Sequence, residues 1–214
     1  MKLRKLAMSC MVGIPLAACG GSGGPGVSEI DFTPKTLETY LDDGEALVAL
    51  YRSPIENDEF VSPDTFPTVG TASYLGAMAF SGSAIPPDFD NLVQNSYAIS
   101  DMTLSVDLAE NEIVGTASNF IRLADERVLA GELTLTATLG RNFDVEDDFA
   151  LIGDITGTLE SSDGPVGAVE MEALGDFYGD GGEAIFGLSS GTAAFSETAS
   201  SADVSATFLL RRSD

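Results

Sequence analysis

The chain has 214 residues, among them 34 acidic and ten basic side chains, and it contains neither histidine nor tryptophan. A surface this acidic repels phosphate backbones, which excludes DNA and RNA as partners. The lack of histidine removes the usual general base and the commonest metal ligand, and with them any Ser-His-Asp hydrolase.

The N-terminus has the parts of a bacterial lipoprotein signal peptide, which we place at residues 1–18. The positively charged MKLRK precedes LAMSCMVGIPL, an apolar stretch too short to span a bilayer as a stable helix. The lipobox Leu16-Ala17-Ala18-Cys19 follows, with small residues that give the peptidase access and a thiol that receives diacylglycerol. We therefore predict that Cys19 begins the mature protein and is anchored by acyl chains, palmitate among them. The alternative, an ordinary secretory signal, would leave a lone reactive thiol.

Cleavage changes both the charge and the cysteine count. The mature chain then has seven basic and all 34 acidic side chains, which gives a net charge near −27. Cys10 leaves with the signal peptide, so Cys19 has no partner for an internal disulfide. Gly20 rather than Asp follows the lipid site, which by resemblance to lipoprotein sorting in Gram-negative bacteria implies the outer membrane, at its periplasmic face or the cell surface. The glycine-rich segment 19–29 is typical of a flexible tether.

Residues 30–65 form the next predicted unit, an N-terminal helix and loop. Between residues 35 and 51 apolar side chains recur at roughly helical spacing, with Gly44 as an interruption. We expect a short helix, or two separate turns, lying against the domain that follows. The proline- and acid-rich residues 52–69 are typical of a loop.

From Gly70 the apolar pattern alternates with period two, which is typical of strands with one buried face. Eight such runs are separated by turn-forming segments, and we place them near residues 70–82, 96–108, 112–121, 128–140, 149–160, 166–175, 183–191 and 202–211. This succession predicts an all-β domain at residues 66–214, an eight-stranded antiparallel up-and-down β-barrel with a filled interior. We expect Gly76, Gly153 and Gly157 to relieve crowding inside it.

The outer faces of these strands carry mainly Thr, Ser and Asp. In the last run the pattern places Val204 and Phe208 inside the barrel, and Ser205 and Thr207 outside in water. A transmembrane barrel needs instead an outer apolar band with aromatic girdles. We therefore predict a soluble barrel, and we expect it to be a monomer.

Four segments of the barrel region carry motifs in a set order. They are FPTVGTASYLGAMAFSG (66–82), SDMTLSVDLAENEIVGTASNF (100–120), GDITGTLES (153–161) and ALGDFYGDGGEAIFGLSSG (173–191). Their P-x-x-G-x-A-x-Y-x-G opening, alternating hairpin, G-x-x-x-G-x-L strand and G-x-F-Y-G segment resemble the β-barrel domain of transferrin-binding protein B-like lipoproteins. The chain looks like a small single-barrel member of this family over residues 66–212, although it lacks the two glycines that the family often has near Ile185-Phe186-Gly187.

This resemblance implies an outer-membrane-anchored, non-enzymatic binding module for a host or nutrient ligand of iron-carrier or haem type. The alternative is a structural or protective envelope lipoprotein without a specific small ligand. Within the G-x-F-Y-G segment we expect Phe177 to fill one end of the barrel and Tyr178 to cover that end with its hydroxyl in water. We expect Gly179 to adopt a positive φ.

Two further patterns raise the question of chemistry. Residues 187–191 match the G-x-S-x-G nucleophile elbow, but that motif needs a strand-to-helix turn and a histidine, so we interpret it as a chance match. Acidic side chains cluster at Asp147-Asp148 and around Asp176, Asp180 and Glu183, where a glycosidase pair or a weak Ca²⁺ site is the alternative to a solvated loop. We predict no catalytic residue, no cofactor and no metal site.

Overall fold

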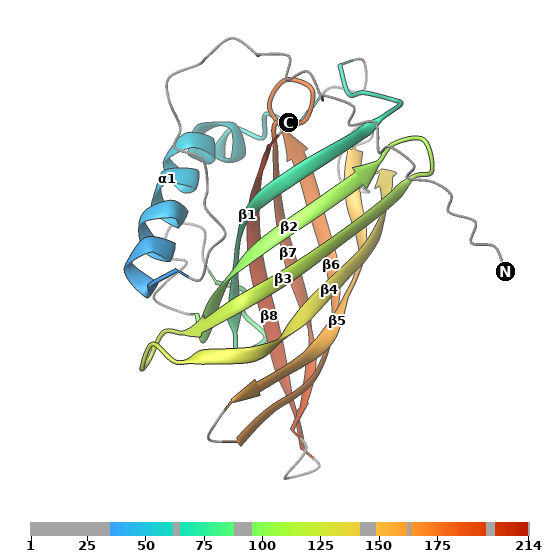
Figure 1. Cartoon of the computed structure of the whole chain (residues 1–214). Helices are drawn as coiled ribbons and strands as arrows, with labels where there is room; N and C mark the ends of the chain where they lie inside the picture. Colours follow the sequence, from blue (N-terminus) through green and yellow to red (C-terminus); the bar gives the residue numbers. More distant parts are fainter. Residues whose placement is uncertain are drawn as a thin grey trace, which may run out of the picture.

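The strands expected from Gly70 onward close into a β-barrel, and one helix lies against its outer wall (Figure 1). The computed structural model describes residues 35–61, 65–87, 96–141, 149–161, 164–195 and 200–213. Its elements are α1 (Leu37–Glu56), β1 (Thr71–Ser81), β2 (Ala98–Asp107), β3 (Glu112–Arg122), β4 (Val128–Arg141), β5 (Phe149–Ser161), β6 (Gly164–Tyr178), β7 (Ala184–Phe195) and β8 (Ser200–Arg212). All neighbouring strands are antiparallel, and β8 pairs with β1 to close the barrel. The predicted eight-stranded antiparallel barrel is thus confirmed.

The interior of the barrel is filled by side chains from every strand. Alternate residues point inward, as in β4, where Leu133, Leu135 and Ala137 are buried while Thr134 and Thr136 between them are not. The inward side chains form one continuous apolar cluster. Burial of this apolar surface is the main force that closes the sheet on itself.

Glycine occupies inward positions where two strands approach closely. A Cβ atom added to Gly153 or to Gly157 would lie 2.2 Å from a backbone carbonyl oxygen of β4, and one added to Gly76 would lie 2.0 Å from that of Leu209. Such distances leave no room for any side chain, so these glycines relieve crowding as predicted.

Helix α1 is longer and more regular than its sequence indicates. It begins at the Thr36 cap, whose Oγ1 accepts a hydrogen bond from the Thr39 N–H at 3.3 Å. The interruption expected at Gly44 does not occur, and the helix continues through Pro54 in its last turn, so the loop expected from residue 52 begins only after Glu56. Glycine costs a helix about 1 kcal/mol, and here the packing of one helix face on the barrel offsets that cost.

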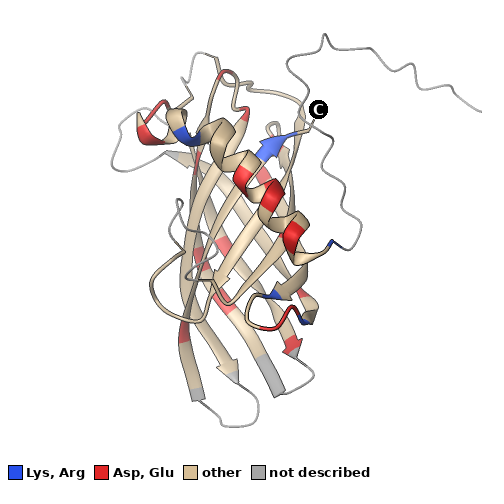
Figure 2. Cartoon of the chain, turned by 90° about the vertical axis from the view of Figure 1, so that its left-hand side faces the viewer, with Lys and Arg blue, Asp and Glu red and all other residues tan. Residues whose placement is uncertain are grey.

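Two small apolar clusters join α1 to the outer wall. Near the start of the helix Tyr40 packs with Ile99 of β2 and Ile121 of β3. Near its end Leu47 and Tyr51 lie in a second cluster, which we call the α1–β8 cluster, with the outward residues Tyr178, Ala184 and Leu209. Figure 2 shows the helix crossing the outside of the barrel, with many more acidic than basic residues on this side.

The outer face of β8 is buried, which corrects one expectation. Ser205 and Thr207 were expected in water but are less than 2% exposed. The Ser205 hydroxyl donates to the carbonyl oxygen of Ser83, and the Thr207 hydroxyl donates to that of Pro87, each at 2.7 Å. Residues 82–87, which follow β1, therefore cover this face, and carbonyl groups of this segment satisfy the polar side chains.

Several predictions fall outside the described residues, among them the signal peptide, Cys19, the tether and Asp147-Asp148. Among the residues that are described, no helix combines the length and the apolar character needed to cross a membrane.

The two kinds of glycine should respond oppositely to alanine. A Cβ atom on Gly44 would meet no atom within 4 Å, so Gly44→Ala should raise the free energy of unfolding by about 0.5–1 kcal/mol through helix propensity. Gly157→Ala should lower it by about 1–3 kcal/mol through overpacking. Urea unfolding followed by circular dichroism measures both, and equal effects of the two substitutions would contradict this account.

Candidate functional site

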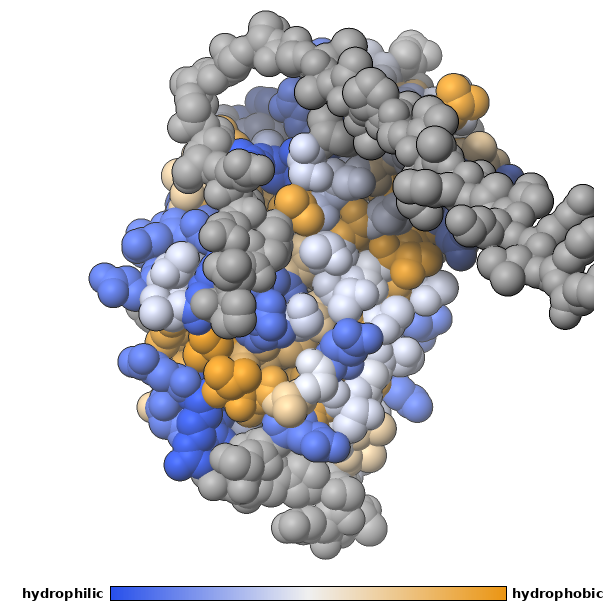
Figure 3. Space-filling model, viewed as in Figure 1, coloured by the Kyte–Doolittle hydropathy of each residue, from blue (hydrophilic) through white to orange (hydrophobic). Residues whose placement is uncertain are grey.

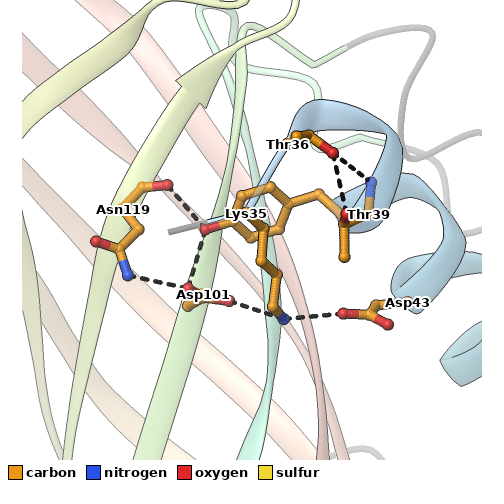
Figure 4. Close-up of polar contacts among 7 residues, drawn as sticks. Lys35, Thr36, Thr39, Asp43, Asp101 and Asn119 are labelled. Carbon is orange, nitrogen blue, oxygen red and sulfur yellow. Dashed lines mark hydrogen bonds and ion pairs between the residues drawn. The ribbon is translucent and has the colours of Figure 1, made fainter. Parts of the chain in front are cut away.

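A buried polar cluster holds the first turn of α1 on the barrel (Figure 4). Lys35 Nζ lies 3.3 Å from Asp101 Oδ1 and 2.8 Å from Asp43 Oδ2. The Tyr40 hydroxyl donates to Asp101 Oδ2 at 2.9 Å, and Asn119 Nδ2 donates to the same oxygen at 3.0 Å. The side chains of Lys35 and Asp101 are only 5% and 4% exposed. One carboxylate thus gathers three donors, from α1, from β3 and from Lys35, two residues before α1.

Irregular backbone in β3 and β4 makes this cluster possible. The register of β2 with β3 shifts between Ile99 and Asp101, and that of β3 with β4 shifts between Ala117 and Phe120. Within the second shift Asn119 has a φ of 58°, a value that Asn tolerates better than most residues. Its carbonyl oxygen lies 3.0 Å from the Tyr40 hydroxyl. Bulges of this kind redirect side chains locally, and here they bring Asn119 to α1.

The electrostatics of the cluster favour a neutral tyrosine. Burial, followed by the negative charge of Asp101 and the hydrogen bond to it, raises the pKa of Tyr40 well above its ordinary value. Lys35 Nζ also lies 5.4 Å from the centre of the Tyr40 ring, within range of a cation–π attraction. Because the charged groups satisfy one another, the arrangement is suited to docking the helix rather than to binding a ligand.

The structure places the G-x-F-Y-G residues on two different faces. Phe177 is fully buried inside the barrel end, with its ring centre 5.0 Å from that of Phe66 and 6.1 Å from that of Tyr74. Gly179 has a φ of 77°, so both of these expectations are confirmed. Tyr178 was expected over the barrel end and instead lies on the outer wall in the α1–β8 cluster. Successive strand residues point to opposite faces, which explains the error.

The nucleophile-elbow motif lies in the middle of a strand. Ser189 is 3% exposed inside the barrel, and its hydroxyl donates to the Ala206 carbonyl oxygen at 3.5 Å. β7 continues beyond the motif to Phe195, so the strand-to-helix turn that an elbow needs is absent from this part of the structure. This context agrees with a chance match.

The acidic link between β6 and β7 does not assemble a metal site. Asp180 and Glu183 are exposed, while Asp176 is half-buried in β6. Among the described residues, no three His, Cys, Asp or Glu side chains converge as metal ligands. The carboxylates of this link are therefore arranged as separate surface groups.

The outer wall of the barrel is mixed in character. On the face drawn in Figure 3, hydrophilic residues lie between groups of apolar ones. Over β5, β6 and β7 the wall is hollowed by a groove of about 670 Å³. Ile152, Leu174 and Leu188 line it in a row across the three strands, and Ala84 and Pro86 line it from the β1–β2 connection. This volume lies within the usual range of ligand pockets, about 300–1,000 Å³, so the β5–β7 groove is the candidate binding site.

Sequence reasoning found neither the polar cluster nor the groove. Lys35 and Asp101 are 66 positions apart, and only the docking of α1 brings them together. Leu174 and Leu188 occupy outward positions where the strand pattern puts polar residues, and two such exceptions on consecutive strands were the available signal for the groove.

Comparisons with known proteins add little to this description. No family model and no curated protein matches the chain. Among solved structures it is similar to two mutant forms of transferrin-binding protein B from Haemophilus parasuis Hp5, with 17% and 16% identity and TM-scores of 0.40 and 0.41. It is also similar to intact Ap-TbpB, with 14% identity and a TM-score of 0.41. Each match covers 72% of this chain but only 28% of the other, and similarity this low assigns neither a family nor a function.

Removing the shared carboxylate should loosen α1. Asp101→Asn should lower the free energy of unfolding by about 1–3 kcal/mol, because buried donors lose a charged acceptor. Lys35→Met should cost less in the Asp101→Asn background than in the wild type, which a double-mutant cycle by urea unfolding measures. Glu112→Gln, an exposed change on β3, is the control and should stay within about 0.5 kcal/mol. An Asp101→Asn effect no larger than that of the control would refute the assignment.

The raised pKa of Tyr40 predicts loss of stability at high pH. The folded protein keeps the hydroxyl protonated, whereas the unfolded chain ionises near pH 10.0. The free energy of unfolding should therefore be insensitive to this group below pH 10 and fall above it, by up to about 1.4 kcal/mol per pH unit. Tyr40→Phe should flatten this slope between pH 10 and 11 in urea titrations. Some slope should remain, because burial also raises the pKa of Tyr51.

Proposed function

We propose that this protein is a lipoprotein of the outer membrane of a Gram-negative bacterium, anchored through Cys19. Its barrel then acts as a non-enzymatic module that binds another molecule. The lipobox and the glycine-rich tether support the anchor, and a tether of this length would hold the barrel just beyond the lipid headgroups. The barrel supports the second part, because its described residues form a groove on the outer wall.

The groove on the outer wall is the observation that carries this proposal. Inside the barrel the space is occupied by the continuous apolar cluster, so a ligand has to approach from outside. Closure also gives each described strand a neighbour on both sides, which disfavours binding by addition of a strand. Recognition through side chains on the wall remains, and the groove is where apolar side chains stay accessible.

A protein ligand suits this surface better than haem does. The sequence resemblance implies iron carriers or haem as ligands, and haem carries two carboxylates of its own. The described residues that line the groove include Asp154 and Glu172 and no basic residue, so the groove repels an anionic ligand. We therefore favour an iron-carrier protein or a comparable polypeptide.

A structural or protective role without a ligand is the second candidate. The filled interior favours it, because such a protein needs stability and solubility alone. The two functions differ in whether the outer wall has a partner.

Acylation at Cys19 tests the anchor. The full chain should incorporate labelled palmitate and sediment with outer membranes, whereas Cys19→Ser should lose the label and leave the membrane fraction. Cys10→Ser changes the other cysteine and should retain both properties. Label that persists in Cys19→Ser would contradict the anchor.

Binding to purified ligands tests the module itself. The full chain, immobilised in a non-ionic detergent, should bind an iron-carrier protein saturably and should not bind haem. If haem alone is retained, our choice of ligand class is wrong. If neither is retained, the structural role replaces the binding role.

A further inference from the structure

The β5–β7 groove combines an apolar row with unpaired acidic groups. Register places Ile152 beside Leu174 and Leu174 beside Leu188, so the row crosses three strands. Leu174 and Leu188 are 46% and 43% exposed, an unusual extent for two neighbouring leucines on a barrel wall. Neighbouring strands lie about 4.8 Å apart, so the row is about 10 Å long. That length accommodates roughly three residues of an extended peptide.

Two carboxylates stand next to this row. Asp154 of β5 and Glu172 of β6 are direct cross-strand neighbours, and both are exposed. Among the described residues neither forms an ion pair or a side-chain hydrogen bond. Like charges placed directly opposite each other destabilise a sheet, so this pair does not contribute to the stability of the barrel. A cation bound between them would relieve the repulsion.

The sequence segment that forms the groove strands contains no basic residue. From residue 142 to residue 210 the chain has 14 acidic residues and neither Lys nor Arg. This stretch includes the whole of β5, β6 and β7. The negative potential over the groove therefore has no internal counter-charge from its own strands, and it attracts cations.

We infer that the β5–β7 groove binds a cationic segment of a partner protein, in which one apolar side chain is flanked by Lys or Arg. This inference rests on the proposed role as a binding module and specifies the chemistry of its ligand. The apolar side chain lies on Leu174 and Leu188, and the flanking cations pair with Asp154 and Glu172. An uncharged apolar ligand would leave these carboxylates partly desolvated without a partner.

Charge also decides against the other occupants. A second copy of the cleaved chain has the same net charge, near −27, and is repelled. The headgroups of anionic lipids are repelled for the same reason. A basic polypeptide segment is complementary to both the carboxylates and the apolar row, since it supplies a cation and an apolar group together.

A blocked peptide with one Leu between two pairs of Lys is the probe. Titrated into the full chain in a non-ionic detergent, it should bind saturably with one site, and its affinity should fall as NaCl rises from 50 to 300 mM. NMR shifts should map to β5–β7. The same peptide with Glu in place of Lys, or with Ser in place of Leu, should bind at least tenfold more weakly.

Matched variants separate the groove from general acidity. The double variant Asp154→Asn with Glu172→Gln should lower the affinity for the peptide at least tenfold. The control, Glu112→Gln with Glu132→Gln, removes the same charge elsewhere on the wall and should change that affinity less than twofold. The first pair should also leave the thermal midpoint unchanged or raised, because it removes a repulsion. A structural role for these acids predicts a lower midpoint instead, and that result would overturn the inference.

A second pair tests the apolar row in the same way. Leu174→Ser should lower the affinity for the peptide at least fivefold. Val128→Ser, at an outward position of β4 that is 70% exposed, should leave the affinity within twofold. Equal weakening by all variants, or equal binding of the Glu peptide, would refute the groove as the site. A dimer that sediments as such and is abolished by Leu174→Ser would assign the groove to a second copy instead.

The outcomes also separate this inference from the proposed function. Failure of the Lys peptide together with saturable binding of an iron-carrier protein would reject the groove chemistry and keep the module. Loss of acylation from the wild-type chain would reject the anchor and leave the groove result intact.

Discussion

The closing of eight alternating strands around a filled interior determines most of what this molecule can do. An eight-stranded barrel has just enough interior volume for side chains, and here buried side chains from all strands occupy it. Each described strand has a neighbour on both sides, so most of its backbone groups are paired. Closure thus leaves the outer wall as the main surface for binding.

The outer wall is divided by what covers it. Helix α1 packs across β2, β3 and the end of β8, and the β1–β2 connection accepts hydrogen bonds from β8. These contacts convert outward polar positions into buried ones. The groove over β5–β7 lies beside this covered region, and among the described residues of the connection Ala84 and Pro86 line it. The uneven cover therefore creates the groove.

The buried cluster around Asp101 has a cost as well as a benefit. Burying a carboxylate and an ammonium group is unfavourable unless each is paired and hydrogen-bonded. Asp101 meets that condition through Lys35, Tyr40 and Asn119. Such a cluster specifies one docked position for α1, whereas the apolar contacts alone would tolerate sliding.

Local patterns in the sequence predicted much of the fold. The alternation of apolar residues located all eight strands to within a few residues, because period two is a property of each strand by itself. It also identified Gly76, Gly153 and Gly157, since a glycine on an apolar inner face indicates close strands. Errors arose where a second element covered a strand, as at Ser205 and Thr207, and where the alternation of a strand put Tyr178 on the outer wall.

The sequence by itself therefore determined the strands and their inward faces, which depend on neighbouring residues, and the acidity of the chain, which depends on composition alone. Only the tertiary structure decided which outward residues are buried, that Lys35 meets Asp101, and that Leu174 and Leu188 form one row. These features join residues that are distant in the chain. They follow from strand register and from the path of α1 across the barrel, which no local pattern specifies.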